Sequence, residues 1–146
     1  SFVPKNLNSE FYSYTHNAYK PNIGKICVLL KAEVKNNDEK IKKFGKNLCM
    51  HIAASKPLAL DIDKLDLSLI EKEKEVQLAT IKSSGKPENI VEKILEGKMK
   101  KYFSEVTLLN QPYIFDTDKD VRKVVLEFSS NNIFNILNYE LFVLGS

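Results

Sequence analysis

The clearest hydrophobic pattern in the chain lies between residues 88 and 104. Apolar residues in this stretch recur at steps of three and four: Ile90, Val91, Ile94, Leu95, Met99, Tyr102 and Phe103. Such spacing places them on one face of a helix, while the charged residues between them fall on its other faces. The preceding segment, residues 66–84, is apolar at both ends and charged in between, so it predicts a second helix with a weaker apolar face.

The residues between these two helices have the composition of a tight connection, S-S-G-K-P (83–87). Gly85 can adopt the left-handed conformation that ends a helix, and Pro87 suits the first turn of the next helix. A short connection makes consecutive helices antiparallel neighbours. The pattern therefore predicts a helical hairpin over residues 66–104, in which each helix of about 18 residues is about 27 Å long.

Three segments outside the hairpin have the pattern of strands. Residues 10–16 are aromatic and alternate loosely, and the run I-C-V-L-L-K-A (26–32) is rich in strand formers. A loop with proline and glycine separates them, so we expect the second to be a buried strand antiparallel to the first. A final strand is predicted over residues 133–143, where apolar residues alternate at Leu137, Tyr139, Leu141 and Val143.

Two further helices are predicted on either side of the hairpin. Asp38 can cap a helix that runs to about Ser55, and Pro57 prevents its continuation. The second helix is expected at about residues 118–129, capped within residues 116–118, with one apolar side at Val121, Val124, Val125 and Phe128. The apolar stripe expected for the first helix is Ile41, Phe44, Leu48, Cys49, Ile52 and Ala53.

The order of these elements is typical of an α+β fold. It predicts a small three-stranded antiparallel sheet packed against helices. The 146 residues fit one domain, or one domain with a projecting element. Residues 106–115 have no helical period, and Pro112 makes them a poor central strand.

Composition excludes several classes of protein. Apolar residues make up 43% and charged residues 28%, which is ordinary for a globular protein. The net charge is only +3, with the two signs interleaved. Nucleic acid is therefore not expected as the main partner, because its binding usually needs a one-sided basic patch. No apolar run approaches the roughly 18 residues of a membrane span, so no membrane association is expected.

No catalytic or metal-binding constellation stands out. The glycines are scattered, so no phosphate-binding loop is present, and the cysteines and histidines lack metal-ligand spacing. Cys49 and His51 are two positions apart, which on a helix points them in different directions. We interpret Cys27 and Cys49 as reduced residues in or near the core. His51 is interpreted as a hydrogen-bonded helix residue, and the alternating charges of residues 71–75 as a solvated helix face.

One extended segment, Q-P-Y-I-F (111–115), leaves two interpretations open. It places three large apolar residues beside a proline. They can fill the core, or they can form an exposed apolar patch for a partner. His16 stands at the end of a predicted strand, where it can be an ordinary loop-edge histidine or a surface contact.

Several short motifs occur in order along nearly the whole chain, from about residue 11 to residue 143. They are S-Y-T-H (13–16) with I-G-K-I-C-V-L (23–29), M-H-I-A-A-S-K-P (50–57), S-G-K-P-E (84–88), E-K-I-L-E-G-K-M-K-K-Y (92–102) and E-V-T-L-L-N-Q-P-Y (105–113). Together they resemble the motifs of translation elongation factor Ts. That family is the guanine-nucleotide exchange factor of elongation factor Tu. It acts by coupled binding rather than covalent catalysis, so the resemblance implies neither an enzyme nor a cofactor.

The resemblance implies that the chain corresponds to the C-terminal half of the family. Residues 1–146 would then be a single dimerisation-type domain, with a core of residues 10–65 and 105–146 and residues 66–104 as a protruding coiled-coil hairpin. The family motifs T-G-x-G-x-x-x-C-K-K-A-L and T-D-F-V do not occur in these residues. We therefore expect the chain to supply Tu-binding surface rather than exchange by itself, with a self-association module as the alternative.

The resemblance also implies site residues. His16 falls on a family histidine that touches Tu, and Ile114 and Phe115 fall on an apolar pair that contacts the third domain of Tu. The C-terminal Y-E-L-F-V-L-G-S (139–146) departs from the family's R-F-E-V-G-E-G-I-E, so only the last strand is expected there. The implied partners are Tu, GDP-bound or nucleotide-free, and a second copy of the chain. The implied location is the bacterial cytoplasm, with the mitochondrial matrix or plastid stroma as alternatives.

Overall fold

The computed structural model describes residues 7–16 and 24–144. It divides the chain into two compact units, one formed by Ser1–Lys56 with Pro112–Ser146 and the other by Pro57–Gln111. The single domain with a protruding hairpin over residues 66–104 stays a prediction.

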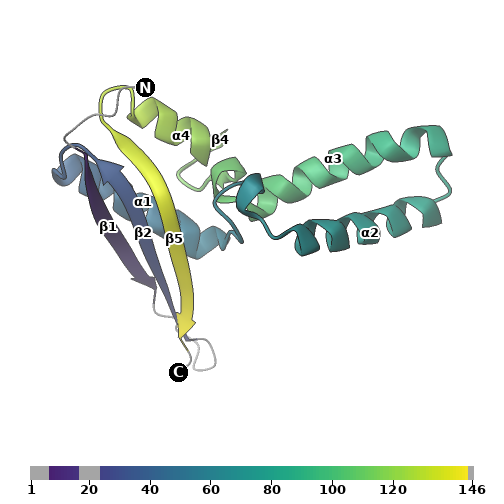
Figure 1. The fold of residues 1–146 in the computed structure, drawn as a ribbon, viewed down its shortest axis with the longest axis horizontal. Helices are drawn as coiled ribbons and strands as arrows, with labels where there is room; N and C mark the ends of the chain where they lie inside the picture. The colour runs from purple at the N-terminus through teal and green to yellow at the C-terminus, as the bar shows by residue number, and fades with distance from the viewer. Residues whose placement is uncertain (1–6, 17–23, 145–146) are drawn as a thin grey trace. The chain divides into compact units, whose positions relative to one another are not determined.

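A three-stranded antiparallel sheet forms the base of the first unit (Figure 1). Its strands are β1 (Asn8–His16), β2 (Lys25–Val34) and β5 (Phe134–Leu144), in the order β1-β2-β5. Both pairs are antiparallel. The sheet packs against helix α1, so the predicted α+β class and its three-stranded sheet are confirmed.

Strand β2 explains why one face of the sheet is covered. Its buried residues alternate along the strand and are Ile26, Val28, Leu30, Ala32 and Val34. Successive side chains of a strand point to opposite faces, so this set faces the helices while its neighbours in sequence are half-exposed. Residues Phe11 and Phe142, which pair with the opposite set, are more than 40% exposed.

Strand β5 changes phase at Leu137. Lys31 pairs with Asn138 and Ala32 pairs with Ile136, which leaves Leu137 as the extra residue of a β-bulge. The predicted alternation through Leu137 is therefore wrong for that residue, which is 39% exposed. Instead Phe134, which is fully buried, joins the covered face at the start of the strand.

Helix α1 (Glu39–Ser55) begins and ends as its sequence predicts. The Asp38 carboxylate accepts the backbone N–H of Ile41 at 3.0 Å, and Lys56 ends the helix in a left-handed conformation with φ 46°. Every residue of the predicted stripe is buried: Ile41, Phe44, Leu48, Cys49, Ile52 and Ala53. Gly45 and His51 are buried as well, which the apolar pattern does not reveal.

Helix α4 (Val121–Phe128) begins later than predicted. Residues 116–118 belong to strand β4 (Asp116–Asp120), which pairs with the short strand β3 (Pro112–Tyr113). Asp120 is the N-cap, and its carboxylate accepts the N–H of Lys123 at 2.8 Å. The predicted helix exists, but the prediction was wrong about its cap, because the first two aspartates serve the hairpin. At its other end Phe128 stacks on Phe44, with ring centroids 3.9 Å apart.

The second unit contains helices α2 (Leu67–Ser83) and α3 (Glu88–Val106), which run antiparallel and pack on each other (Figure 1). Gly85 turns the chain with φ 76°, as its predicted left-handed conformation requires. Pro87 is the N-cap of α3, one position before the first turn that it was expected to enter. Helix α3 continues to Val106, further than its apolar pattern indicates, and a 3₁₀ turn follows (η2, Leu108–Asn110).

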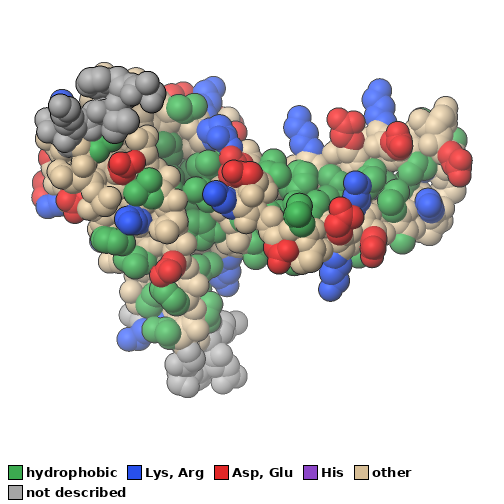
Figure 2. All heavy atoms as spheres, viewed as in Figure 1, with side chains coloured by type: hydrophobic (Ala, Val, Ile, Leu, Met, Phe, Trp, Pro, Cys, Tyr) green, Lys and Arg blue, Asp and Glu red, His purple; other side chains and the backbone are tan. Residues whose placement is uncertain are grey.

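The seam between α2 and α3 is only partly buried. Ile81, Val91 and Met99 are buried, whereas the remaining residues of the predicted apolar face are half-buried or, as for Ile90, exposed. Charged side chains of both signs surround the hydrophobic side chains of this pair (Figure 2). Near the start of the unit, a 3₁₀ turn (η1, Ile62–Lys64) leads into α2, and the N–H of Leu108 bonds to Ala59 at 2.9 Å.

Candidate protein-binding site

The turn of the β3–β4 hairpin presents two adjacent apolar side chains to solvent. Tyr113 pairs with Asp116, so Ile114 and Phe115 form the turn between them. Ile114 is 37% exposed and Phe115 is 52% exposed, whereas Tyr113 is buried. Of the two interpretations of this segment, core filling therefore holds for Tyr113, and surface exposure holds for Ile114 and Phe115.

The turn rests on a histidine of helix α1. His51 is fully buried, and its Nδ1 accepts the backbone N–H of Ile114 at 3.2 Å. A ring nitrogen that accepts a hydrogen bond carries no proton, so Nδ1 of His51 is unprotonated in this contact. The Tyr113 ring lies over the imidazole with centroids 5.8 Å apart, and Phe115 meets Tyr113 edge-on at 5.5 Å. His51 is thus a hydrogen-bonded helix residue, as interpreted from the sequence.

Burial also affects the ionisation of Tyr113, which lies beneath Phe115. Desolvation raises the pKa of the Tyr113 phenol above its ordinary value. The ring therefore stays neutral at physiological pH and acts as an apolar platform for Phe115. The supporting roles of Tyr113 and His51 could not be found from the sequence. His51 and Ile114, which form the hydrogen bond, are 63 positions apart along the chain.

One ion pair connects strand β4 of the hairpin to helix α4, and a second lies within β4. The Lys119 ammonium lies 2.7 Å from a carboxylate oxygen of Glu127 and 3.9 Å from one of Asp116. The hydrogen bond between Lys119 and Glu127 raises the pKa of the lysine and lowers that of the glutamate. Exposed ion pairs contribute little to stability, so these two add little to the attachment of β4.

His16 lies at the end of strand β1 and is exposed. Its Nδ1 is 3.3 Å from the Tyr14 hydroxyl, and the two rings stack at 6.3 Å. Within the described residues, no hydrogen bond or ring contact joins His16 to Ile114 or Phe115. The structure brings together Ile114 and Phe115 of the three predicted site residues, and places His16 on a separate element of the same unit.

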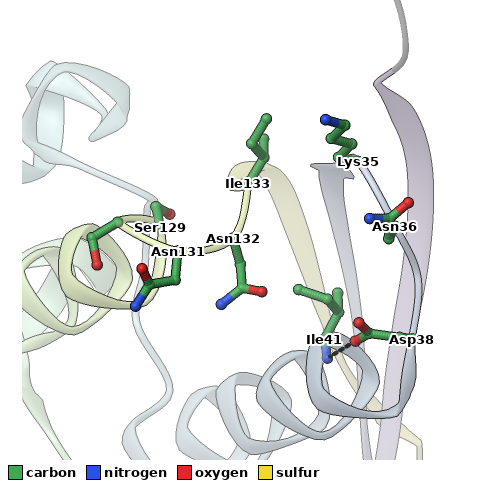
Figure 3. A pocket seen from close by; sticks show the side chains of 9 residues that line it. Lys35, Asn36, Asp38, Ile41, Ser129, Asn131, Asn132 and Ile133 are labelled. Atoms are coloured by element: carbon green, nitrogen blue, oxygen red, sulfur yellow. Dashed lines mark hydrogen bonds between the residues drawn. The ribbon is translucent and has the colours of Figure 1, made fainter.

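The polar pocket in Figure 3 is a separate feature of the first unit. Its charged members are Lys35 and Asp38, one of each sign, and Asp38 already serves as the cap of α1. Its balanced charge favours no ligand class, so we assign it no binding role. The residues that line it are Lys35, Asn36, Asp38, Ile41, Ser129, Ser130, Asn131, Asn132 and Ile133.

Residues 7–16 and 24–144 contain neither a metal-binding group nor a membrane-spanning helix. In this part of the chain, no group of three or more His, Cys, Asp or Glu side chains is placed to hold a metal ion. None of its helices combines the length and the hydropathy needed to cross a membrane.

Comparisons with known proteins agree with each other. The family model described as Elongation factor TS matches residues 3–146. Elongation factor Ts, mitochondrial, of Plasmodium chabaudi chabaudi is 36% identical over 155 residues, covering 99% of this chain and 41% of that protein. Elongation factor Ts of Roseobacter denitrificans is 49% identical over 109 residues, covering 75% and 36%. That of Rhodospirillum centenum is 43% identical over 113 residues, covering 77% and 37%.

These matches place the chain in the class of elongation factors of protein synthesis. The chain belongs to the elongation factor Ts family. It spans about two fifths of the length of the relatives that it matches.

Proposed function

We propose that this chain supplies a binding surface for elongation factor Tu, as part of an elongation factor Ts that promotes release of GDP from Tu. The observation that carries the proposal is the exposed pair Ile114 and Phe115 above buried Tyr113 and His51. Adjacent exposed apolar side chains on a rigid support are typical of an interface anchor, because little order is lost when they bind. Family membership supplies the identity of the partner.

His16 is proposed as a second contact. It is exposed at the end of β1, and the Tyr14 ring stacked beside it limits its orientations. An imidazole can donate and accept hydrogen bonds, so His16 adds a polar contact to an otherwise apolar anchor.

Calorimetry with cognate Tu tests the proposal, and Phe115→Ala is its sharpest variant. If Phe115 is an anchor, the variant should weaken binding by about 1–3 kcal/mol, which is roughly 5- to 150-fold in Kd. Its thermal midpoint should stay nearly unchanged, because the ring is half exposed. Phe11→Ala is the matched control, since Phe11 is an equally exposed phenylalanine on strand β1.

Three results would count against this surface. No detectable binding of the wild-type chain at tens of micromolar would remove the proposal for these residues. Equal losses of affinity from Phe115→Ala and Phe11→Ala would show that Phe115 is not a specific anchor for Tu. If the main effect of Phe115→Ala were a lowered thermal midpoint, Phe115 would be a core-filling residue rather than an interface anchor.

A self-association module is the second candidate. The groove along α2 and α3 favours it, because apolar side chains line a surface that charged residues of both signs border. The apolar members of this lining are Ile70, Leu95, Met99 and Phe103. Sedimentation of the chain at several concentrations tests this candidate, and a strictly monomeric profile would argue against it.

The place of action should follow that of the partner. We expect the bacterial cytoplasm, with the mitochondrial matrix or plastid stroma as alternatives. The match to the Plasmodium protein supports the mitochondrial alternative, since it covers 99% of this chain and that relative's name includes the word mitochondrial. Immunofluorescence of the tagged full-length protein would decide between the compartments.

A further inference from the structure

We infer that His51 is the positioning residue of the Tu-binding turn: its Nδ1 holds the Ile114 N–H and thereby sets the direction in which Ile114 and Phe115 point. The inference rests on the proposed function for its effect on Tu binding. The contact itself rests on the geometry of the first unit.

The turn has little other support from its own hairpin. Strand β3 is two residues long, and the pairing slips between Pro112, opposite Asp120, and Tyr113, opposite Asp116. Proline has no N–H to donate to a ladder. A regular hairpin is held by alternating pairs of backbone hydrogen bonds, and this one is too short and too irregular for that. The N–H of Ile114 bonds to a side chain of α1 instead.

Histidine suits this position for two reasons. Its planar ring packs against the Tyr113 ring at 5.8 Å, which fixes the residue just before the turn. Its Nδ1, on a fully buried side chain, supplies a fixed acceptor for the partly buried N–H of Ile114, and leaving such a donor without a partner costs free energy. An apolar residue could fill the space but could not accept the Ile114 N–H.

The matched variants are His51→Asn and His51→Leu. Asn and Leu have the same branched shape and both lose the imidazole ring, including any contact through its far edge. They differ in that the Asn side chain carries an oxygen that can accept the Ile114 N–H. Any difference between the two variants therefore reports the acceptor rather than packing or the rest of the ring.

Three measurements on the two variants test the inference. Hydrogen exchange at the Ile114 amide should be at least tenfold faster in His51→Leu than in His51→Asn, while exchange at Val28 in the central strand should match. The Kd for Tu should be at least fivefold weaker for Leu than for Asn. In a Phe115→Ala background this ratio of Kd values should be smaller, because the turn has lost one of its two anchor side chains.

The outcomes distinguish this inference from the proposed function. If wild-type chain binds Tu and Phe115→Ala weakens binding, equal Kd values for the Asn and Leu variants overturn the positioning role. If Tu does not bind, the proposed function fails, and Ile114 exchange alone decides the contact: equal rates in the two variants overturn it. Equal acceleration at Ile114 and Val28 in the Leu variant would mean a general loss of stability, which also overturns a specific role.

Discussion

Gly45 lies in the middle of helix α1, against the ring of Tyr12. A Cβ at this position would be 2.5 Å from both Cγ and Cδ1 of that ring. The ring has little freedom to move, because Tyr12 is buried and its hydroxyl donates to Asn37 Oδ1 at 2.8 Å. The glycine is therefore required by the close approach of helix and sheet.

Gly45→Ala should destabilise the protein. Ala is favoured over Gly in a helix by about 1 kcal/mol, but overpacking typically costs about 1–3 kcal/mol, so we expect a net loss of about 1 kcal/mol. Gly97→Ala is the matched control, because Gly97 lies within α3 and nothing is within 4 Å of its Cβ position. That variant should gain about 0.5–1 kcal/mol. Urea denaturation measures both, and a stabilising Gly45→Ala would contradict the packing argument.

The two cysteines should differ sharply in reactivity. Burial raises the pKa of the Cys49 thiol to about 12, although a hydrogen bond from the Leu30 backbone acts the other way. The thiolate is the reactive form, so Cys49 should resist a thiol reagent at pH 8. Cys27 is half-buried on the sheet face opposite α1 and should react first. Mass spectrometry after labelling with and without denaturant would check this, and rapid labelling of Cys49 in the folded protein would contradict it.

The site residues show what sequence can and cannot provide at this scale. Ile114 and Phe115 could be proposed as contacts because a motif precedes them directly, Q-P-Y (111–113). Their support could not, since nothing local marks His51 as the acceptor for an amide in a distant hairpin. The apolar pattern leaves His51 outside the predicted buried stripe of its helix, although the side chain is fully buried.

At the scale of elements, the turn between α2 and α3 depends on the backbone of Gly85. Its φ of 76° is a left-handed conformation, and no atom lies within 4 Å of a Cβ built there. Gly85→Ala should therefore cost about 1 kcal/mol through backbone strain alone. Gly85→Asn should cost less, because Asn tolerates this conformation better than Ala. Thermal unfolding followed by circular dichroism measures the difference, and equal midpoints for Ala and Asn would show that the turn relaxes.

The cap of α1 was predicted correctly, and that of α4 was not. The predicted cap of α1, Asp38, accepts the N–H of Ile41. Asp116, Asp118 and Asp120 alternate before α4, and each has a side chain that can cap a helix. Asp116 pairs with Tyr113 and Asp120 with Pro112, and Asp120 is the residue that caps α4. A local pattern cannot contain this information.

At the scale of the whole molecule, the sheet order could be anticipated only in part. The sequence predicts β1 next to β2, because consecutive strands of a chain usually pair. The pairing of β2 with β5 joins segments about a hundred residues apart, and the bulge at Leu137 reverses which residues of β5 are covered. The two-residue alternation is interrupted at the bulge. An alternation followed backwards from the C-terminus therefore assigns the wrong face to the residues before the bulge.

The last prediction concerns exchange. A factor that binds nucleotide-free Tu more tightly than Tu with GDP weakens the binding of GDP by the same factor, because the coupling is reciprocal. The apolar anchor at Ile114 and Phe115 is expected on the third domain of Tu, and the T-D-F-V motif, whose Asp-Phe pair would enter beside the magnesium site, does not occur in this chain. The chain should therefore bind both forms of Tu with equal Kd within about threefold, which corresponds to a coupling below about 1 kcal/mol.

Release of a fluorescent GDP analogue from Tu measures the consequence directly. At saturating chain, the release rate should stay within about threefold of the rate for Tu alone, a change of less than about 1 kcal/mol in the release barrier, because the T-D-F-V motif expected beside the magnesium site does not occur in this chain. A full-length elongation factor Ts relative provides the positive control in the same assay. Acceleration of release by these 146 residues would show that the surface around His16 or the turn already distinguishes the two states of Tu, and the separation of anchoring from exchange would then be wrong.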